Sequence, residues 1–334
     1  MYSIDMGSAA SVVKQSYDFT KRQYMTSKVL PKLMTLRTLE TKKNGIVSKT
    51  DEKELNDMEV GDDEDQCPVE TMKTTKEEIG QLVREAQVLM DRGGEVRLEQ
   101  AKNLYEQVVE GREKLLGPFH ANTLKSISVL GSILHKLNKL PKARLEYEKA
   151  LYGYEQVFGI DNKDTLNCMN SLAEVLKGLD LNEEAINMFK ECLAGKERLY
   201  GDHESTFITA NHLADLLKKT RRIPEARDVY VKALQGKEKI LGDNHPSTVN
   251  AMTNLALIQK QLGNLKDAID LYERALQRQE QLYGLRHENT IRTAKHLYIL
   301  LSVRSVNRKE EANALMKRVG LSSGDASQIS SLEN

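Results

Sequence analysis

Histidines are the first side chains in this sequence that could support chemistry, because imidazole binds metals and transfers protons near neutral pH. Four of the seven stand three residues before a threonine, at His120, His203, His245 and His287. Asn162 takes the same place before Thr165. Asparagine is a good cap for the N-terminus of a helix but a poor replacement for a metal-binding histidine. We therefore predict a capping or packing role for these residues at helix starts, and no metal site.

The cysteines and glycines give no sign of catalysis. The cysteines, which are Cys67, Cys168 and Cys192, show no CxxC spacing and no nearby pair of histidines. The chain contains similar segments that repeat along it, and the position of Cys192 is taken in other copies by Ala150, Ala233 and Ala275. Cys192 is therefore expected to be a small buried residue. Gly93-Gly94 is an isolated pair and not a phosphate-binding loop. The sequence predicts no catalytic residue, no cofactor and a non-enzymatic protein.

The elements that would position any site come from an internal repeat. An apolar residue followed by glycine recurs every 41 or 42 residues, at Leu116-Gly117, Phe158-Gly159, Tyr200-Gly201, Leu241-Gly242 and Tyr283-Gly284. A threonine follows each of them, at Thr123, Thr165, Thr206, Thr248 and Thr290. The single shorter interval contains the loop Gly201-Asp202-His203-Glu204-Ser205, which lacks one residue. Such a fixed period is the signature of a repeat protein.

Counting from each threonine gives the same helical pair in every unit. Leucine stands at +7, a small residue in most units at +8, alanine at +20, an aromatic residue at +24 and Ala-Leu or Cys-Leu at +27 and +28. The apolar positions before +15 form one stripe of a first helix, and the later ones belong to a second. Such a pair cannot bury its own apolar face, so the pairs must stack. We expect about six pairs over residues 76–319, the first opening with a helix near 75–90 and the last, 290–301 with 310–319, acting as a cap.

This skeleton matches the tetratricopeptide repeat. The long form, with Leu241-Gly242-Asp243-Asn244-His245-Pro246 and then Asn254-Leu255-Ala256, closely resembles the repeats of kinesin light chains and nephrocystin-like proteins. The resemblance implies an all-α fold, a right-handed superhelical α-solenoid. It also implies that the first helices line a concave groove in which peptides bind. Kinesin light chains precede their repeats with a long coiled coil, whereas residues 1–75 contain no sustained heptads.

A polar stripe runs along the first helices at +2, +5, +9 and +12, opposite the apolar one. We call its candidate binding residues the first-helix face: Lys125, Ser128, His135, Asn167, Asn170, Lys177, Asn211, Lys218, Asn250, Thr253, Lys260, Arg292 and Lys295. Asparagine amides could bond a peptide backbone, and lysines could bind its carboxylates. The alternative is a solvated helix face without a partner. Glu174 and Asp215 interrupt the positive row and argue against a purely acidic ligand.

The flanking segments differ from the repeats in composition. Residues 1–43 are basic and rich in Ser and Thr, with possible short helices, and suit either a mitochondrial transit peptide or a disordered tail. Residues 44–75 are expected to be an acidic disordered linker, with the acidic run 51–65 either a solvated spacer or an internal competitor for the first-helix face. Residues 320–334 are expected to be a disordered Ser-rich tail.

Charge and hydropathy limit the partners. Lys plus Arg and Asp plus Glu are both 49, so no basic stripe dominates and nucleic acid is not expected. No apolar run approaches a transmembrane length. Two hypotheses remain: an adaptor that binds a protein or peptide in its groove, or a constitutive subunit of a mitochondrial, ciliary or cytoskeletal assembly. The expected compartment is the cytoplasm, with mitochondrion or cilium as alternatives.

Overall fold

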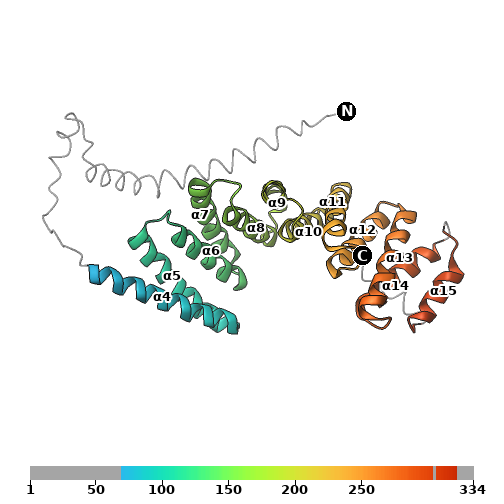
Figure 1. The fold of residues 1–334 in the computed structure, drawn as a ribbon, viewed down its shortest axis with the longest axis horizontal. Helices are drawn as coiled ribbons and strands as arrows, with labels where there is room; N and C mark the ends of the chain where they lie inside the picture. Colours follow the sequence, from blue (N-terminus) through green and yellow to red (C-terminus); the bar gives the residue numbers. More distant parts are fainter. Residues whose placement is uncertain (1–68, 304–305, 322–334) are drawn as a thin grey trace, which may run out of the picture. The chain divides into compact units, whose positions relative to one another are not determined.

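A computed structural model describes residues 69–303 and 306–321, and these form twelve α-helices without a strand (Figure 1). They form six pairs. The first helices are α4 (Val69–Arg92), α6 (Ala121–Lys136), α8 (Lys163–Gly178), α10 (Glu204–Lys219), α12 (Pro246–Gln261) and α14 (Glu288–Ser302). The second helices are α5 (Glu95–Leu116), α7 (Leu140–Phe158), α9 (Asn182–Tyr200), α11 (Ile223–Leu241), α13 (Leu265–Tyr283) and α15 (Lys309–Arg318). The all-α fold and the six pairs are confirmed.

The helices stack in chain order. From α5 to α15 each helix packs against the next, and the main contacts are between neighbours in sequence. From Met72 onward, the described helices belong to one compact unit. The expected basic segment 1–43, the acidic run 51–65 and most of the tail 320–334 lie outside the described residues. Helix α4 begins at Val69, earlier than the residue near 75 where we expected it.

The core lies between the helices of each pair and between neighbouring pairs, at the positions that the repeat predicts. The alanines at +20 are completely buried: Ala143, Ala185, Ala226 and Ala268. The aromatic residues at +24 are at most 3 % exposed: Tyr147, Phe189, Tyr230 and Tyr272. A Cβ atom on Gly131, at +8, would lie 3.2 Å from the ring of Tyr147. The small residue therefore permits the close approach of the two helices, as predicted.

A second close approach was not foreseen from the sequence. Glycine at +30 of the second helix lies against the residue at +1 of the first helix in three successive pairs. A Cβ atom would come within 2.2 Å of Leu124 at Gly153, 2.4 Å of Leu166 at Gly195 and 2.6 Å of Phe207 at Gly236. In the pair α12–α13 the glycine is replaced by Arg278, and the smaller Val249 stands at +1. The size of the residue at +30 is therefore matched to the size of the residue at +1.

Of the capping and packing roles predicted for these residues, the structure shows capping. In α6, α10, α12 and α14 the N-cap is a histidine whose Nδ1 accepts a hydrogen bond from the backbone N–H two residues later, over 3.1–3.2 Å. In α8 the Oδ1 atom of Asn162 accepts the same bond at 2.8 Å. Pro141 and Pro224 stand in the first turn of α7 and α11, where a missing N–H costs nothing. The recurring histidines thus begin the first helices.

The turns inside the pairs need a left-handed residue. Asn138, Asp180 and Gly263, expected in these turns, have φ values of 56°, 57° and 78°. Arg221 takes the same place before α11 with φ 62°, although arginine has no side chain that favours this region. The residue type at 221 does not predict this conformation, because only the position in the repeat indicates it.

Candidate partner-binding surface

The first-helix face is accessible to solvent along five first helices, α6 to α14. At +2 the side chains of Lys125, Asn167, Asn250 and Arg292 are exposed, and the chosen residues at +5 and +12 are half-buried. Position +2 of α10 is Ile208, which is 45 % exposed. The structure therefore places the sequence-predicted residues at the same register on successive helices. Their role in binding stays a prediction.

The outermost row of this face has free polar groups. The side chains of Lys125, Asn167 and Asn250 make no hydrogen bond and no ion pair with any other described residue. Arg292 donates a hydrogen bond to Asn289 within its own helix, at 2.9 Å. Amides and a cation that are exposed and unpaired can bond the backbone and carboxylates of an extended peptide.

The lysines at +12 are less available than the sequence suggested. Lys177 Nζ lies 2.5 Å from Glu174 on the preceding turn, and Lys218 Nζ lies 3.4 Å from Asp215. Both ammonium groups are thus balanced by the acids at +9 of their own helices. At His135, which takes the +12 place in α6, burial lowers the pKa of the imidazole. The row is therefore mixed in charge and not a continuous cationic ladder.

Two residues that the sequence analysis missed hold the acids at +9 in place. His212 Nδ1 of α10 lies 2.9 Å from Glu174 Oε1 of α8. Tyr230 donates a 2.6 Å hydrogen bond to Asp215. Burial alone would raise the pKa of Glu174, but the contacts with His212 and Lys177 outweigh it and lower the pKa to about 2. The centre of the face is therefore a cross-linked polar cluster.

The +5 row also joins neighbouring helices. Thr209 of α10 donates a 2.9 Å hydrogen bond to Asn170 Oδ1 of α8, and Lys196 of α9 donates one to the same threonine. Asn211 Oδ1 is buried and has no hydrogen-bond partner among the described residues. The two predicted residues therefore differ. Asn170 Oδ1 accepts a hydrogen bond from the neighbouring helix, whereas Asn211 Oδ1 accepts none from the described residues.

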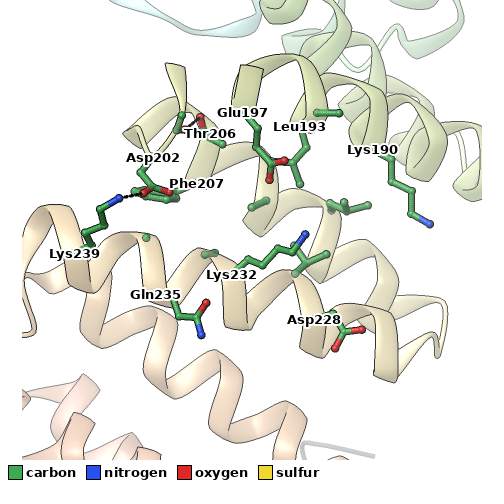
Figure 2. Close-up of a pocket in the computed structure, with 17 residues that line it drawn as sticks. Lys190, Leu193, Glu197, Asp202, Thr206, Phe207, Asp228, Lys232, Gln235 and Lys239 are labelled. Atoms are coloured by element: carbon green, nitrogen blue, oxygen red, sulfur yellow. Dashed lines mark hydrogen bonds and ion pairs between the residues drawn. The ribbon is translucent and has the colours of Figure 1, made fainter. Parts of the chain in front are cut away.

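A cavity of about 620 Å³ lies on the other side of α10, between α9 and α11 (Figure 2). Phe207, Ala210 and Leu213 of α10 form its apolar floor. Leu193 and Glu197 of α9 face Lys232 of α11 across it, and Val229 of α11 is also part of its lining. We call this the α9–α11 cavity. The sequence analysis did not predict it, although the shortened loop before α10 was a local signal that this unit differs.

Clustered metal ligands and reactive thiols are two routes to chemistry in the part of the chain that the structure describes. No group of three or more His, Cys, Asp or Glu side chains could hold a metal ion there. Cys168 and Cys192 are free thiols that are at most 2 % exposed. Burial raises the pKa of both thiols, which makes them weak nucleophiles. Within the same residues, no helix combines the length and the apolar character that a membrane crossing requires.

A stack of helix pairs with a small residue at +8 and alanine at +20 defines the class of helical repeat proteins. Two family models, both described as Tetratricopeptide repeat, match residues 95–151 with 205–281 and residues 165–204. Together they cover just over half of the chain, and neither is a model of an enzyme. The chain belongs to the tetratricopeptide repeat family. No curated protein matches its sequence significantly.

Solved structures show the same fold. Nearly identical TPR-like repeats of a Podosopora anserina kinesin light chain are 19 % identical, with a TM-score of 0.56 over 61 % of this chain and 98 % of theirs. BtubC (BKLC) from P. vanneervenii is 18 % identical, with a TM-score of 0.52 over 71 % of this chain and 89 % of its own. The apo form of RapI is 11 % identical, with a TM-score of 0.56 over 72 % and 83 %. At these identities the likeness is one of fold.

Proposed function

We propose that the protein is a non-enzymatic adaptor or scaffold that binds a partner peptide or protein along the first-helix face, in the concave groove of its solenoid. The observation that carries this proposal is the +2 row. It combines exposed, unpaired polar groups at Lys125, Asn167 and Asn250 with the exposed Ile208. Amides for a peptide backbone, a cation for a carboxylate and an apolar contact make up a peptide-binding surface.

Affinity purification of the tagged full-length protein tests this proposal. One variant carries Lys125→Glu, Asn167→Ala and Asn250→Ala, and a second carries Lys177→Glu, Lys218→Glu and Lys260→Glu. The matched control reverses three exposed lysines of second helices, Lys142, Lys266 and Lys309, which have no partner among the described residues. We expect both face variants to lose partners that the control keeps. Partners retained by both face variants would refute the proposal.

An alternative function is that of a constitutive subunit in a larger assembly, and one observation favours it. The +34 position at the end of four successive second helices carries an exposed aliphatic side chain. These are Val157, Leu199, Ile240 and Leu282, with exposures of 39–48 %. Aliphatic side chains at one register can form a contact surface between proteins. If Leu199→Lys and Ile240→Lys together release stoichiometric partners that the face variants retain, the subunit function is supported over the adaptor function.

For the compartment we propose the cytoplasm. Cys168 and Cys192 are free thiols, as is usual where the environment is reducing. A mitochondrial, ciliary or cytoskeletal location would suit the alternative function. Fluorescence imaging of the tagged full chain, compared with a chain that lacks residues 1–43, distinguishes these locations. Organelle staining that depends on residues 1–43 would contradict a cytoplasmic protein.

A further inference from the structure

An ion pair at one repeat position joins α11 to α13 and α13 to α15. The corresponding pair is missing in the gap between the described helices α9 and α11. A glutamate at +32, near the end of a second helix, pairs with an arginine of the following second helix. Glu238 of α11 lies 2.8 Å from Arg274 of α13, and Glu280 of α13 lies 2.6 Å from Arg318 of α15. The residues that correspond to Glu238 and Arg274 in the α9–α11 gap are Glu197 and Lys232.

Neither of these two side chains has an ion-pair or hydrogen-bond partner in the described part of the chain. Figure 2 shows Glu197 and Lys232 on opposite walls of the α9–α11 cavity, with both side chains directed into it. The other charges of its lining are satisfied: Lys239 pairs with Asp202 at 3.0 Å, Lys190 with Glu225 at 2.8 Å, and Asp228 with the adjacent Arg227 at 2.8 Å. The open charges are therefore those that face each other across the apolar floor.

The residues around the α9–α11 cavity also differ from their counterparts in the other units, in loop length, in one backbone angle and in one side chain. The loop before α10 is one residue shorter than its siblings. Gly201, which ends α9, has a ψ of −136°, whereas the glycines that end α5, α7, α11 and α13 have values of 162–175°. The residue at +1 is Phe207, the only aromatic one among the five units that begin at Thr123 to Thr290. These three features distinguish this unit from the other units of the repeat.

We propose that the α9–α11 cavity is a second docking site, separate from the first-helix face, for a peptide segment of a partner protein. The segment inserts one large apolar side chain over Phe207, Ala210 and Leu213. It has an acidic side chain that meets Lys232 and a basic side chain that meets Glu197. Charge complementarity supports this occupant, because a purely acidic or purely basic segment would leave one wall with a like charge. An apolar group alone would leave both charges unpaired.

Fluorescence polarisation with labelled nine-residue peptides tests the proposal on the full-length protein. The peptide set has Leu or Phe at the centre, with an acidic residue on one side and a basic residue on the other, in both orders. The reference peptides replace the central residue with Ser or both charges with Gln. We expect binding by at least one charge order, weakened at least tenfold in each reference peptide.

Two variants locate the binding. Ala194→Phe fills the cavity from its half-exposed α9 wall and should weaken binding at least tenfold. Lys232→Glu should change the preference of the site, so that peptides with two basic residues bind better than mixed ones. Arg274→Glu is the matched control, because it reverses the same repeat position in the closed gap, and it should leave peptide affinity unchanged. Circular dichroism verifies that each variant is folded.

Several results would overturn the proposal. Binding of no member of the peptide set to the wild-type protein would do so, as would equal binding by the Ala194→Phe variant. Self-association that Ala194→Phe abolishes would assign the cavity to a second copy of the chain. The variant with Lys177→Glu, Lys218→Glu and Lys260→Glu should bind the peptides normally, so that failure of the first-helix face and failure of this site are distinguishable.

Discussion

Replacement of Gly153 by alanine should destabilise the protein, although alanine is the better helix former. In the middle of a helix the exchange gains about 1 kcal/mol of helix propensity. Here the new methyl group would lie 2.2 Å from Cδ2 of Leu124 and 3.1–3.2 Å from its Cδ1 and Cγ atoms. Leu124 is 1 % exposed, so its side chain has no open space to enter. Overpacking of a core costs about 1–3 kcal/mol. The net expected loss is therefore about 0–2 kcal/mol, in contrast to the gain of about 1 kcal/mol from propensity alone.

Urea unfolding followed by circular dichroism measures this loss, and two further variants separate the clash from the propensity. Gly80→Ala in α4 is the control, because its Cβ would meet only the flexible end of Arg84, at 3.6 Å. It should stabilise by about 1 kcal/mol if the propensity alone acts. In a Leu124→Val background, which imitates Val249 of the later unit, Gly153→Ala should cost much less. If Gly153→Ala stabilises as much as Gly80→Ala does, the proposed size matching is wrong.

Three further predictions concern a cap, a turn and a buried acid. His203→Asn should preserve the stability of the protein as Asn162 does in α8, whereas His203→Ala should lower it by about 0.5–2 kcal/mol in thermal unfolding. Arg221→Gly should raise stability by about 1 kcal/mol in the same assay, because arginine is strained at φ 62°. The low pKa of Glu174, about 2, implies stability that is present above pH 4.5 and lost as the pH falls toward 2. A shift of that size corresponds to about 3 kcal/mol, so the unfolding free energy of Glu174→Gln should show a smaller decrease over this range. An identical acid decrease in both proteins would contradict the role of Glu174.

The fold could be predicted from the sequence because the same pattern of apolar and small residues recurs in several units. A single unit with Leu at +7 and Ala at +20 is compatible with any amphipathic helical hairpin. The recurrence of this leucine in five units and of this alanine in four excludes other periods. The histidine caps were also predictable, since Asn162 in the same slot reveals what the side chain does. In both cases the information lies in the comparison of one unit with its siblings.

The contacts between helices were not predictable in the same way. Lys196 and Lys237 would be assigned to solvent from their type, yet they are 3 % and 2 % exposed. Lys196 Nζ donates hydrogen bonds to Ser205 O and Thr209 Oγ1 in the first two turns of α10, so that a neighbouring helix replaces water around the ammonium group. Burial lowers the pKa of both lysines. The period of the sequence gives the position of a residue in the pair but not its partner in the next helix.

The candidate sites follow from the same distinction. Residues that recur at one repeat position, such as the alanine at +20 in four units, support the stack, and these four alanines are buried. Binding specificity must come from positions where the units differ, because a partner that contacts only repeated residues could shift by one unit. At +2 the row changes from Lys125 to Asn167 to Ile208, and in the α9–α11 gap the charges of Glu197 and Lys232 stay open. These departures would fix the register of a bound peptide, which is why both proposed surfaces include α10 and its neighbours.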